Sequence, residues 1–262
     1  MQPYFFSTPE ANLFAVYHQP GGASRQTAVL LCYPLFHEYL STHRTCRQLA
    51  GMLGSAGFPV LRFDYFGCGD SGGSAAQASL DGWLRNVAAA ADEIKSRANV
   101  SKLCVIGLRF GATLATLAAC RNSSIDSLVL WDPIARGPDY LADLSIFHDK
   151  VLDEAAAHSP GMVRPAVRDG LSLFGFQSSL TEEMRAIDLL TMSERPAQNV
   201  LLIESTAGKG SPAFAAHLQQ QVSNFQHKNL PAKDLWKLDF DLAMPPREIL
   251  STIVNWISGV CE

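Results

Sequence analysis

The stretch Val105–Ala115, VIGLRFGATLA, contains the pattern from which the fold of this chain can be predicted. Its apolar first part predicts a buried strand, and its small-residue second part predicts a helix. Between them stands the sequence Gly-x-Arg-x-Gly, formed by Gly107, Arg109 and Gly111. Glycines at this spacing allow a sharp turn and close packing of the helix on the strand, which is the layout of a nucleophile elbow. The central residue of that motif is a serine, whereas this chain has Arg109.

Segments with strand patterns alternate with segments that have helical periodicity along the rest of the chain. The expected strands are Pro3–Ser7, Asn12–His18, Thr27–Tyr33, Pro59–Phe63, Lys102–Ile106, Asp126–Trp131, Asn199–Ile203 and Leu235–Phe240. The expected helices are Thr42–Ala56, Leu80–Ala98, Ala112–Cys120 and Ile249–Ile257. This alternation predicts an α/β fold with a mostly parallel sheet of about eight strands, covered by helices on both faces. We expect the first two strands to form an edge hairpin.

The stretch Pro133–Arg195 interrupts this alternation. It spans about 60 helix-rich residues, too many for a structureless loop in a compact domain. We therefore expect a helical cap over residues 133–195, inserted between a first core segment (1–132) and a second one (196–262). Apolar residues of the cap could cover an acyl-sized pocket, although helix packing explains them equally well: Leu141, Leu144, Phe147, Leu173, Phe174 and Phe176.

Composition excludes several classes of protein. The 262 residues are 47% hydrophobic and 18% charged, which is typical of globular proteins. The net charge of -4 and the lack of a basic run argue against nucleic-acid binding. No apolar run approaches the ~20 residues that a membrane helix needs. No signal peptide is visible, so we expect a cytoplasmic location.

No cofactor or metal site is expected from the motifs. The six cysteines are scattered and form no C-x-x-C pair, so the usual sequence signature of zinc and dithiol sites is absent. The sequence GCGDSGG matches the spacing of a dinucleotide-binding loop, but Ser71–Ser79 is too polar and glycine-rich to open a helix. We therefore interpret this segment as a glycine-rich loop.

Four segments resemble the α/β-hydrolase superfamily, nearest to its serine aminopeptidase-like branch: LLCYPLFHEY, FDYFGCGDSGG, GLRFGA and LVLWDP. More narrowly, YLSTHR, RFDYFGCGDSGG and GLRFGATLA resemble a subgroup of hydrolases associated with exosortase or biosynthetic gene clusters. In that subgroup, too, an arginine occupies the elbow. The resemblance implies an α/β-hydrolase fold.

The residues of the superfamily's catalytic triad follow the order Ser, Asp or Glu, His. Arg109 occupies the serine position and cannot act as a nucleophile. Glu204 stands near the acid position, and Asp239–Glu248, where the histidine is expected, contains none. We therefore do not expect a covalent seryl intermediate. Cys68 is the best-placed alternative nucleophile, but we interpret it as a small residue that fills a structural loop.

Arg109 requires an anionic partner, because the N-terminus of the elbow helix carries positive partial charge. One alternative is an internal carboxylate, supplied by Glu38, Asp64, Asp70 or Asp132. The other is the carboxylate or phosphate of a ligand, which would make Arg109 a substrate anchor. The internal pair is favoured because four carboxylates lie on neighbouring loops, but both alternatives remain open.

The loops after the parallel strands converge at one edge of the sheet, where open α/β folds bind ligands. As catalytic residues we predict Arg109 as anion anchor, Glu38 or Asp132 as base, and His43 as acid. As substrate-binding residues we predict Leu35, His37, Arg44, Asp64, Asp70, Ser71, Phe110 and Tyr140.

Structural roles explain several of these residues as well. Thr42 could cap a helix whose exposed first turn contains His43 and Arg44. Asp64 and Asp70 could hold the glycine-rich loop.

Two main functions are compatible with these features. The first is an enzyme without the triad, acting on a small acyl, ester or carrier-bound intermediate by hydrolysis, cyclisation or elimination. The second is a catalytically inactive binding or accessory protein with the same fold. A third, an esterase or peptidase with a displaced nucleophile, fits less well because the serine and histidine are missing. A homodimer is left open.

Overall fold

The structure is a computed structural model that describes residues 1–121, 124–158, 171, 174–206, 210–232, 236 and 244–261. Eight described strands form one sheet, in agreement with the predicted number of about eight, and their order is β1-β2-β4-β3-β5-β6-β7-β8. Their bounds are β1 Gln2–Ser7, β2 Asn12–His18, β3 Thr27–Cys32, β4 Val60–Phe63, β5 Lys102–Leu108, β6 Ser127–Trp131, β7 Asn199–Glu204 and β8 Asn224–Asn229. The expected edge hairpin is confirmed, since β1 pairs antiparallel with β2. From β4 through β8 all neighbouring strands are parallel.

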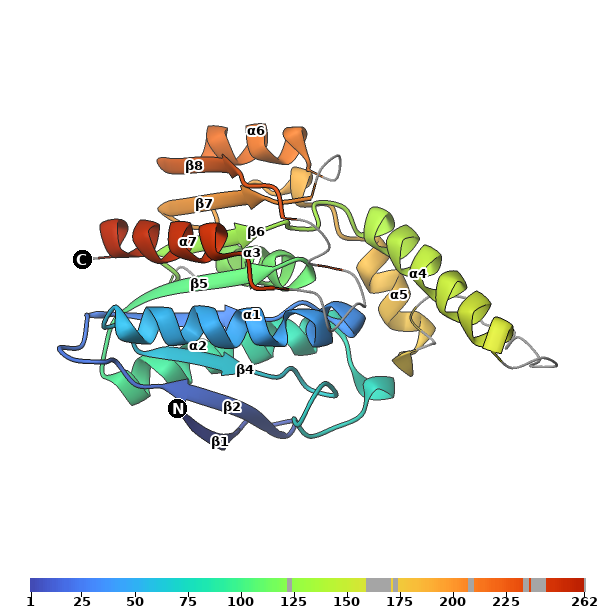
Figure 1. The fold of residues 1–262 in the computed structure, drawn as a ribbon, viewed down its shortest axis with the longest axis horizontal. Coiled ribbons are helices and arrows are strands. Elements are labelled where there is room, and N and C mark those ends of the chain that lie inside the picture. Colours follow the sequence, from blue (N-terminus) through green and yellow to red (C-terminus); the bar gives the residue numbers. More distant parts are fainter. Residues whose placement is uncertain are drawn as a thin grey trace.

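Helices cover both faces of the sheet (Figure 1). Their bounds are α1 Phe36–Ser55, α2 Leu80–Ala98, α3 Phe110–Arg121, α4 Gly137–His158, α5 Ser178–Arg185, α6 Pro212–Gln221 and α7 Arg247–Val260, with short 3₁₀ helices η1 Ala75–Gln77 and η3 Leu189–Thr191. The pair α1 and α7 lies on one face and the pair α2 and α3 on the other. The predicted α/β-hydrolase type of architecture is therefore present.

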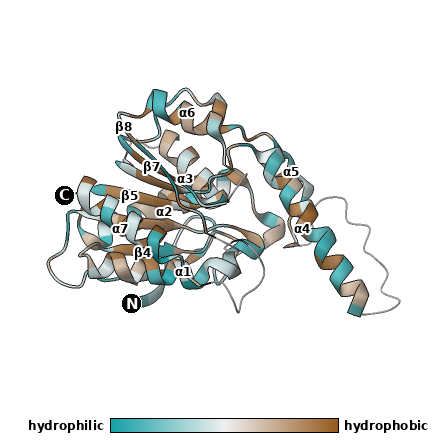
Figure 2. Cartoon of the chain, turned by 45° about the horizontal axis from the view of Figure 1, so that its top comes forward, coloured by the Kyte–Doolittle hydropathy of each residue, from teal (hydrophilic) through white to brown (hydrophobic). Residues whose placement is uncertain are grey.

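Burial of the central strands follows from this two-sided cover. Every residue of β3, β4 and β6 is buried, which fits the uninterrupted apolar runs of parallel strands. Hydrophobic residues dominate central strands such as β5 in Figure 2, whereas the edge strand β8 is more hydrophilic and α4 alternates hydrophobic and hydrophilic residues along its length. The hydrophobic core therefore lies on both faces of the sheet, between the sheet and each helix layer.

The helix α1 begins six residues earlier than the predicted start at Thr42. Its N-cap is Leu35, which forms no side-chain capping bond, and Phe36 at its first position has φ 58°. Thr42 is therefore not a cap, and its hydroxyl donates to the carbonyl of Glu38 at 2.7 Å. The early start was missed because no capping residue marks it. Its consequence is that Glu38 lies in the first turn of a helix rather than in a loop.

The eighth strand of the sheet is β8, Asn224–Asn229, which the sequence patterns did not predict, while the predicted last strand Leu235–Phe240 lies almost entirely outside the described residues. Most of β8 is exposed at the sheet edge, so its sequence NFQHKN lacks the apolar alternation of a half-buried strand. Of residues 235–240, only Trp236 lies among the described residues.

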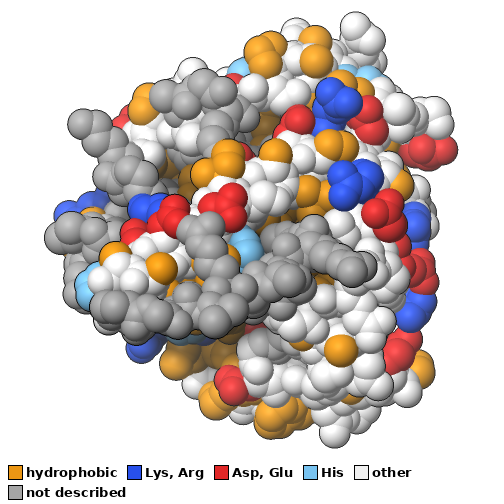
Figure 3. Space-filling model, turned by 90° about the vertical axis from the view of Figure 1, so that its right-hand side faces the viewer, with side chains coloured by type: hydrophobic (Ala, Val, Ile, Leu, Met, Phe, Trp, Pro, Cys, Tyr) orange, Lys and Arg blue, Asp and Glu red, His pale blue; other side chains and the backbone are white. Residues whose placement is uncertain are grey.

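Between β6 and β7, where the cap is predicted, the structure has α4 and α5 beyond the carboxyl ends of the parallel strands (Figure 1). Residues 159–170 and 172–173 of this interval, including Leu173, lie outside the described part. On the surface at the α4 end, acidic and basic side chains of the described residues are interspersed rather than gathered by sign (Figure 3). In this view the described side chains form no basic patch of the kind that marks a nucleic-acid site.

The turn between β5 and α3 depends on two glycines whose hydrogens face other backbone. A Cβ at Gly107 would lie 2.3 Å from the Cα of Ala112, and a Cβ at Gly111 would lie 2.2 Å from the carbonyl oxygen of Tyr33. Both distances are below any real contact, so β3, β5 and α3 can pack as they do only without these side chains. The predicted role of the glycines in close packing is confirmed.

Substituting Gly111→Ala should therefore lower the free energy of unfolding by about 2–3 kcal/mol, since the added methyl must displace backbone. Gly51→Ala is the matched control, because Gly51 is an exposed residue of α1 with open space around its Cα. That change should stabilise the protein by about 0.5–1 kcal/mol through helix propensity. Urea unfolding measures both, and equal effects would contradict the packing argument.

Candidate functional site

Arg109 occupies the elbow between β5 and α3 with φ 52°. A non-glycine residue in this left-handed region costs about 1–3 kcal/mol and persists only where the surroundings impose it. Its N–H donates to the carbonyl of Trp131 at 2.9 Å, and its own carbonyl accepts from Ala112 at 2.9 Å. These bonds tie the turn to β6 on one side and to α3 on the other, as expected for an elbow.

The guanidinium of Arg109 is paired inside the protein. Its Nε donates to Oε1 of Glu38 at 2.7 Å, and the other carboxylate oxygen accepts from the hydroxyl of Tyr140 at 2.9 Å. Arg109 and Glu38 are only 5% and 2% exposed. A terminal nitrogen of Arg109 lies 3.5 Å from Asp143. Of the four predicted internal partners, Glu38 is the one that pairs.

Electrostatics keep this group of side chains together. Burial raises the pKa of Glu38, and the adjacent Arg109 opposes that shift. Burial works against the charge of Arg109, but Glu38 outweighs it and raises the pKa of the guanidinium. Burial and then the charge of Glu38 hold the pKa of Tyr140 well above its usual range. Tyr140 therefore remains a neutral hydroxyl that donates to the carboxylate.

Asp132 follows β6 and is saturated by donors. It has φ 45°, and its Oδ1 accepts from the N–H of Ser205 at 2.7 Å. Its Oδ2 accepts from the hydroxyls of Ser205 and Thr206 and from the indole N–H of Trp236, the last at 2.8 Å. A carboxylate with about four acceptor positions is fully used by four donors. Asp132 is thus built to orient its partners.

Trp236 completes the surroundings of the elbow. Its ring centroid lies 5.7 Å from the guanidinium carbon of Arg109, and the ring centroid of Tyr140 lies 5.8 Å from the same carbon. Trp236 also packs edge-on against Trp131, with ring centroids 5.8 Å apart. The sequence interpretation missed Trp236, because it falls inside the segment that was predicted as a strand.

The remaining predicted residues are not all brought to the elbow. His43 and Arg44 are exposed on α1, and Asp70 is exposed as well. Asp64 accepts from the N–H of Asp70 at 3.0 Å, and Ser71 donates to the carbonyl of Asp64 at 2.6 Å. These are the loop-holding bonds that the structural interpretation of this segment expected. Phe110 is buried and stacks on Tyr140, with centroids 5.3 Å apart.

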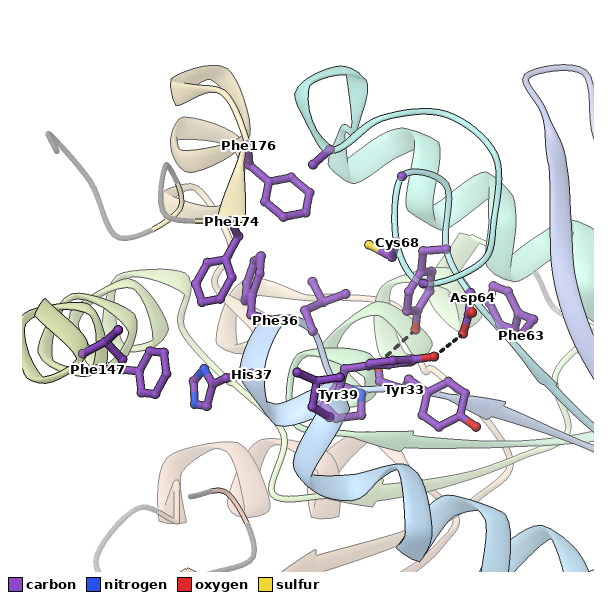
Figure 4. A pocket seen from close by; sticks show the side chains of 18 residues that line it. Tyr33, Phe36, His37, Tyr39, Phe63, Asp64, Cys68, Phe147, Phe174 and Phe176 are labelled. Atoms are coloured by element: carbon purple, nitrogen blue, oxygen red, sulfur yellow. Dashed lines mark hydrogen bonds between the residues drawn. The ribbon is translucent and has the colours of Figure 1, made fainter. Parts of the chain in front are cut away.

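A cavity of about 410 Å³ lies beside the elbow and is lined mainly by aromatic side chains (Figure 4). We call it the aromatic cavity. Its walls come from the start of α1, the glycine-rich loop, α4 and the segment before α5. Its lining includes Tyr33, Leu35, Phe36, His37, Tyr39, Leu40, Phe63, Asp64, Tyr65, Cys68, Phe147, Val151, Phe174 and Phe176. Three of the predicted cap residues, Phe147, Phe174 and Phe176, thus border a pocket, whereas Leu141 and Leu144 are buried elsewhere.

Two reactive side chains line the aromatic cavity. The ring of His37 stacks on Phe147 with centroids 3.7 Å apart, and its buried Nδ1 has no hydrogen-bond partner among the described residues. Burial and the nearby charge of Arg109 lower the pKa of His37 to about 4, so the ring is neutral at pH 7. Burial and the charge of Asp64 raise the pKa of Cys68 to about 12. A protonated thiol is a poor nucleophile, which agrees with the structural interpretation of Cys68.

A second cavity, of about 380 Å³, borders Arg109 on the side of β6 and α6. Its charged lining residues have both signs: Arg109, Arg136, Asp139 and Asp143. Glu204, which stands near the usual acid position, bonds His227 at 3.1 Å and the N–H of Ser211 at 3.0 Å. Within the described residues there is no cluster of His, Cys, Asp or Glu suited to a metal ion, and no helix could span a membrane.

Removal of one partner of the Arg109–Glu38 pair leaves the other buried and uncompensated. Glu38→Leu and Arg109→Met should each lower the free energy of unfolding by about 3–5 kcal/mol. The double variant should lose less than the sum, with a coupling energy of about 1–3 kcal/mol. Asp143→Asn is the control, because its contact with Arg109 is long and partly exposed. Additive single effects in urea unfolding would contradict the pairing.

Comparison with known proteins identifies the family and the fold. The family model of serine aminopeptidase, S33, matches residues 28–190, which is more than half of the chain. No curated protein matches. Similar solved structures include esterase PF2001 from Pyrococcus furiosus, at 17% identity and a TM-score of 0.68 over 100% of this chain and 91% of that one. Est1E from Butyrivibrio proteoclasticus with bound ferulic acid is similar at 15% identity and a TM-score of 0.67, over 97% of both chains.

Mouse alpha/beta hydrolase domain-containing protein 10 is similar at 14% identity and a TM-score of 0.62, over 99% of this chain and 100% of that one. At such identities the solved structures support the fold alone. The family model and the observed sheet order together show that the chain belongs to the serine aminopeptidase S33 family of α/β hydrolases.

Proposed function

We propose that this protein binds an apolar acyl- or ring-bearing small molecule, free or attached to a carrier, in the aromatic cavity. It does so without covalent catalysis at the elbow. The observation that supports this proposal is the internal pairing of Arg109, which is bonded to Glu38 and lies near the rings of Tyr140 and Trp236. An apolar cavity of about 410 Å³, which Arg109 does not line, lies beside the elbow. Ligand sites of proteins are concave and mostly apolar in this way.

Loss of the catalytic triad is part of this proposal. In an elbow hydrolase a histidine links the nucleophile to the acid. In this chain the described side chain that contacts both Arg109 and Asp132 is Trp236, whose indole N–H donates to the acid. No histidine follows His227 in the sequence. An indole has no basic nitrogen and cannot accept a proton from a nucleophile.

A fluorophosphonate probe, which reacts with activated serines, tests the absence of seryl chemistry. The native protein should not be labelled. Arg109→Ser with Trp236→His, in a Glu38→Gln background that removes the unpaired carboxylate, should be labelled at position 109 at least about tenfold faster than the same background with Arg109→Ser alone. Intact-protein mass spectrometry measures the rate.

Ser205→Ala serves as the control, because Ser205 is the buried serine nearest to Asp132 by its hydrogen bonds. Labelling of the native protein that disappears in Ser205→Ala, or in any other single serine variant, would contradict the proposal. It would show a displaced nucleophile instead.

An acid–base enzyme acting on the same type of compound is the second candidate, and His37 favours it. This ring lies on the cavity wall, and burial keeps it neutral with a pKa of about 4. A neutral imidazole can act as a general base.

If His37 is the base, the rate of turnover of a bound ester should be constant above pH 5 and should fall as the pH drops through 4. Turnover should vanish in His37→Phe. Turnover that is unchanged in His37→Phe would exclude this role, with exposed His158→Phe as the control.

A further inference from the structure

Among the described residues that line it, the aromatic cavity has one carboxylate and no cationic side chain. The carboxylate belongs to Asp64, which lies at one end of the cavity together with Cys68, whereas His37 and Phe147 lie at the other end (Figure 4). Arg109, which was predicted to hold an anion, does not line this cavity and is paired with Glu38. The charge that the described lining presents to a ligand is therefore negative.

Asp64 has hydrogen-bonding capacity left over. Its Oδ1 accepts from the hydroxyl of Tyr39 and its Oδ2 from the N–H of Asp70, both at 3.0 Å. An ionised carboxylate offers about four acceptor positions, so these donors use about half of them. Among the described residues no lysine or arginine forms an ion pair with Asp64, although the side chain is only 4% exposed. A buried carboxylate with acceptor capacity left over is stabilised by a further donor.

Among the described residues Arg62 is the cation whose charge acts on Asp64, and its guanidinium is hydrogen-bonded to other groups. It favours the charged form of Asp64 electrostatically, but burial outweighs this and raises the pKa of the carboxyl. The guanidinium of Arg62 donates to Nε2 of His18 at 3.0 Å and to the hydroxyl of Tyr33. The charge of Arg62 therefore partly offsets the negative charge of Asp64, but Arg62 donates no hydrogen bond to the remaining acceptor positions of that carboxylate.

The rest of the cavity fits an apolar body that contains a ring. Phe36 lies 4.7 Å from Phe174 and 5.3 Å from Phe176, measured between ring centroids, so three rings form one wall. Rings of this kind attract other rings in offset or edge-on contact. A volume of about 410 Å³ holds roughly a dozen non-hydrogen atoms, if each takes about the 30 Å³ of a water molecule.

We propose that the aromatic cavity selects a ring-bearing apolar compound of about a dozen non-hydrogen atoms that ends in a hydrogen-bond donor, a hydroxyl or an amine, placed against Asp64. The same compound ending in a carboxylate is rejected, because two carboxylates would meet in a poorly solvated space. This inference rests on the proposed function of the cavity and names the ligand class for it.

Three compounds with the same body test the selection. They are 4-phenylbutan-1-ol, 4-phenylbutylamine and 4-phenylbutanoate, whose binding to the full-length protein is measured by calorimetry at pH 7. The alcohol and the amine should bind at least about tenfold more tightly than the acid, a ratio that corresponds to about 1.4 kcal/mol. Tighter or equal binding of the acid would overturn the inference and leave the proposed function standing.

Variants separate the two proposals further. Asp64→Asn should reduce the alcohol-to-acid ratio of affinities at least about fivefold, and this ratio does not depend on the fraction of protein that is folded. Asp92→Asn is the matched control, because Asp92 is exposed on α2, does not line the cavity and is not among the groups that act on Asp64, so the ratio of affinities in that variant should stay unchanged. An unchanged ratio in Asp64→Asn would overturn the inference.

Val151→Trp, which fills the cavity from α4, should abolish binding of all three compounds. If none of them binds the native protein, or if Val151→Trp binds them equally well, the cavity is not the ligand site. Both the proposed function and the inference would then fail.

Discussion

The buried ion pair between Arg109 and Glu38 is the interaction on which the arrangement of this site depends. A guanidinium at the start of a helix meets unfavourable partial charge, and one that is almost fully buried also loses its hydration. Glu38 offsets both costs only because α1 begins early enough to place it in its first turn, 2.7 Å from Arg109. Tyr140 from α4 satisfies the second carboxylate oxygen. One ion pair thus connects the elbow, the first covering helix and the helices beyond the sheet.

The contacts around this pair also separate the elbow from the aromatic cavity. Phe36 lies on the cavity wall and packs on Tyr140, which in turn stacks on Phe110. This row of rings stands between the cavity lining and the buried charges. A ligand in the cavity therefore meets Asp64 and His37 rather than Arg109. That separation is the reason why we assign ligand binding and the elbow to different roles, although they are neighbours in the fold.

Sequence patterns predicted the sheet well, because long apolar runs and glycine-bounded turns are local signals. The segments Leu80–Ala98 and Lys102–Ile106 were placed within two residues, and the glycines of the elbow act as expected. Two features, the start of α1 and the strand β8, were not predicted, and each has a physical reason. The start of α1 carries no capping side chain, and β8 is an exposed edge strand whose composition is polar. Neither feature produces a hydrophobic periodicity in the sequence.

The candidate site was harder to predict, since it depends on contacts between residues far apart in the chain. Four carboxylates were plausible partners of Arg109, and which one pairs was decided by the early start of α1. Trp236 left no signal at all, because its role comes from lying against Arg109 and Asp132 at once. His43 and Arg44 follow Glu38 on the same helix, but their positions on its exposed side keep them from the elbow. Helical periodicity separates residues that proximity in sequence would group.

The left-handed backbone of Arg109 invites a catalytic interpretation, because strained residues cluster at active sites. Packing gives a sufficient cause without catalysis. The backbone of Gly111 packs directly against the carbonyl of Tyr33, and that of Gly107 packs directly against Ala112. Because of this close packing, α3 can follow β5 only through a very sharp turn. Whatever residue stands at position 109 has to adopt that turn. The backbone strain at Arg109 therefore results from the close packing of α3 on the sheet. It requires no catalytic role of the side chain, which here forms a buried ion pair.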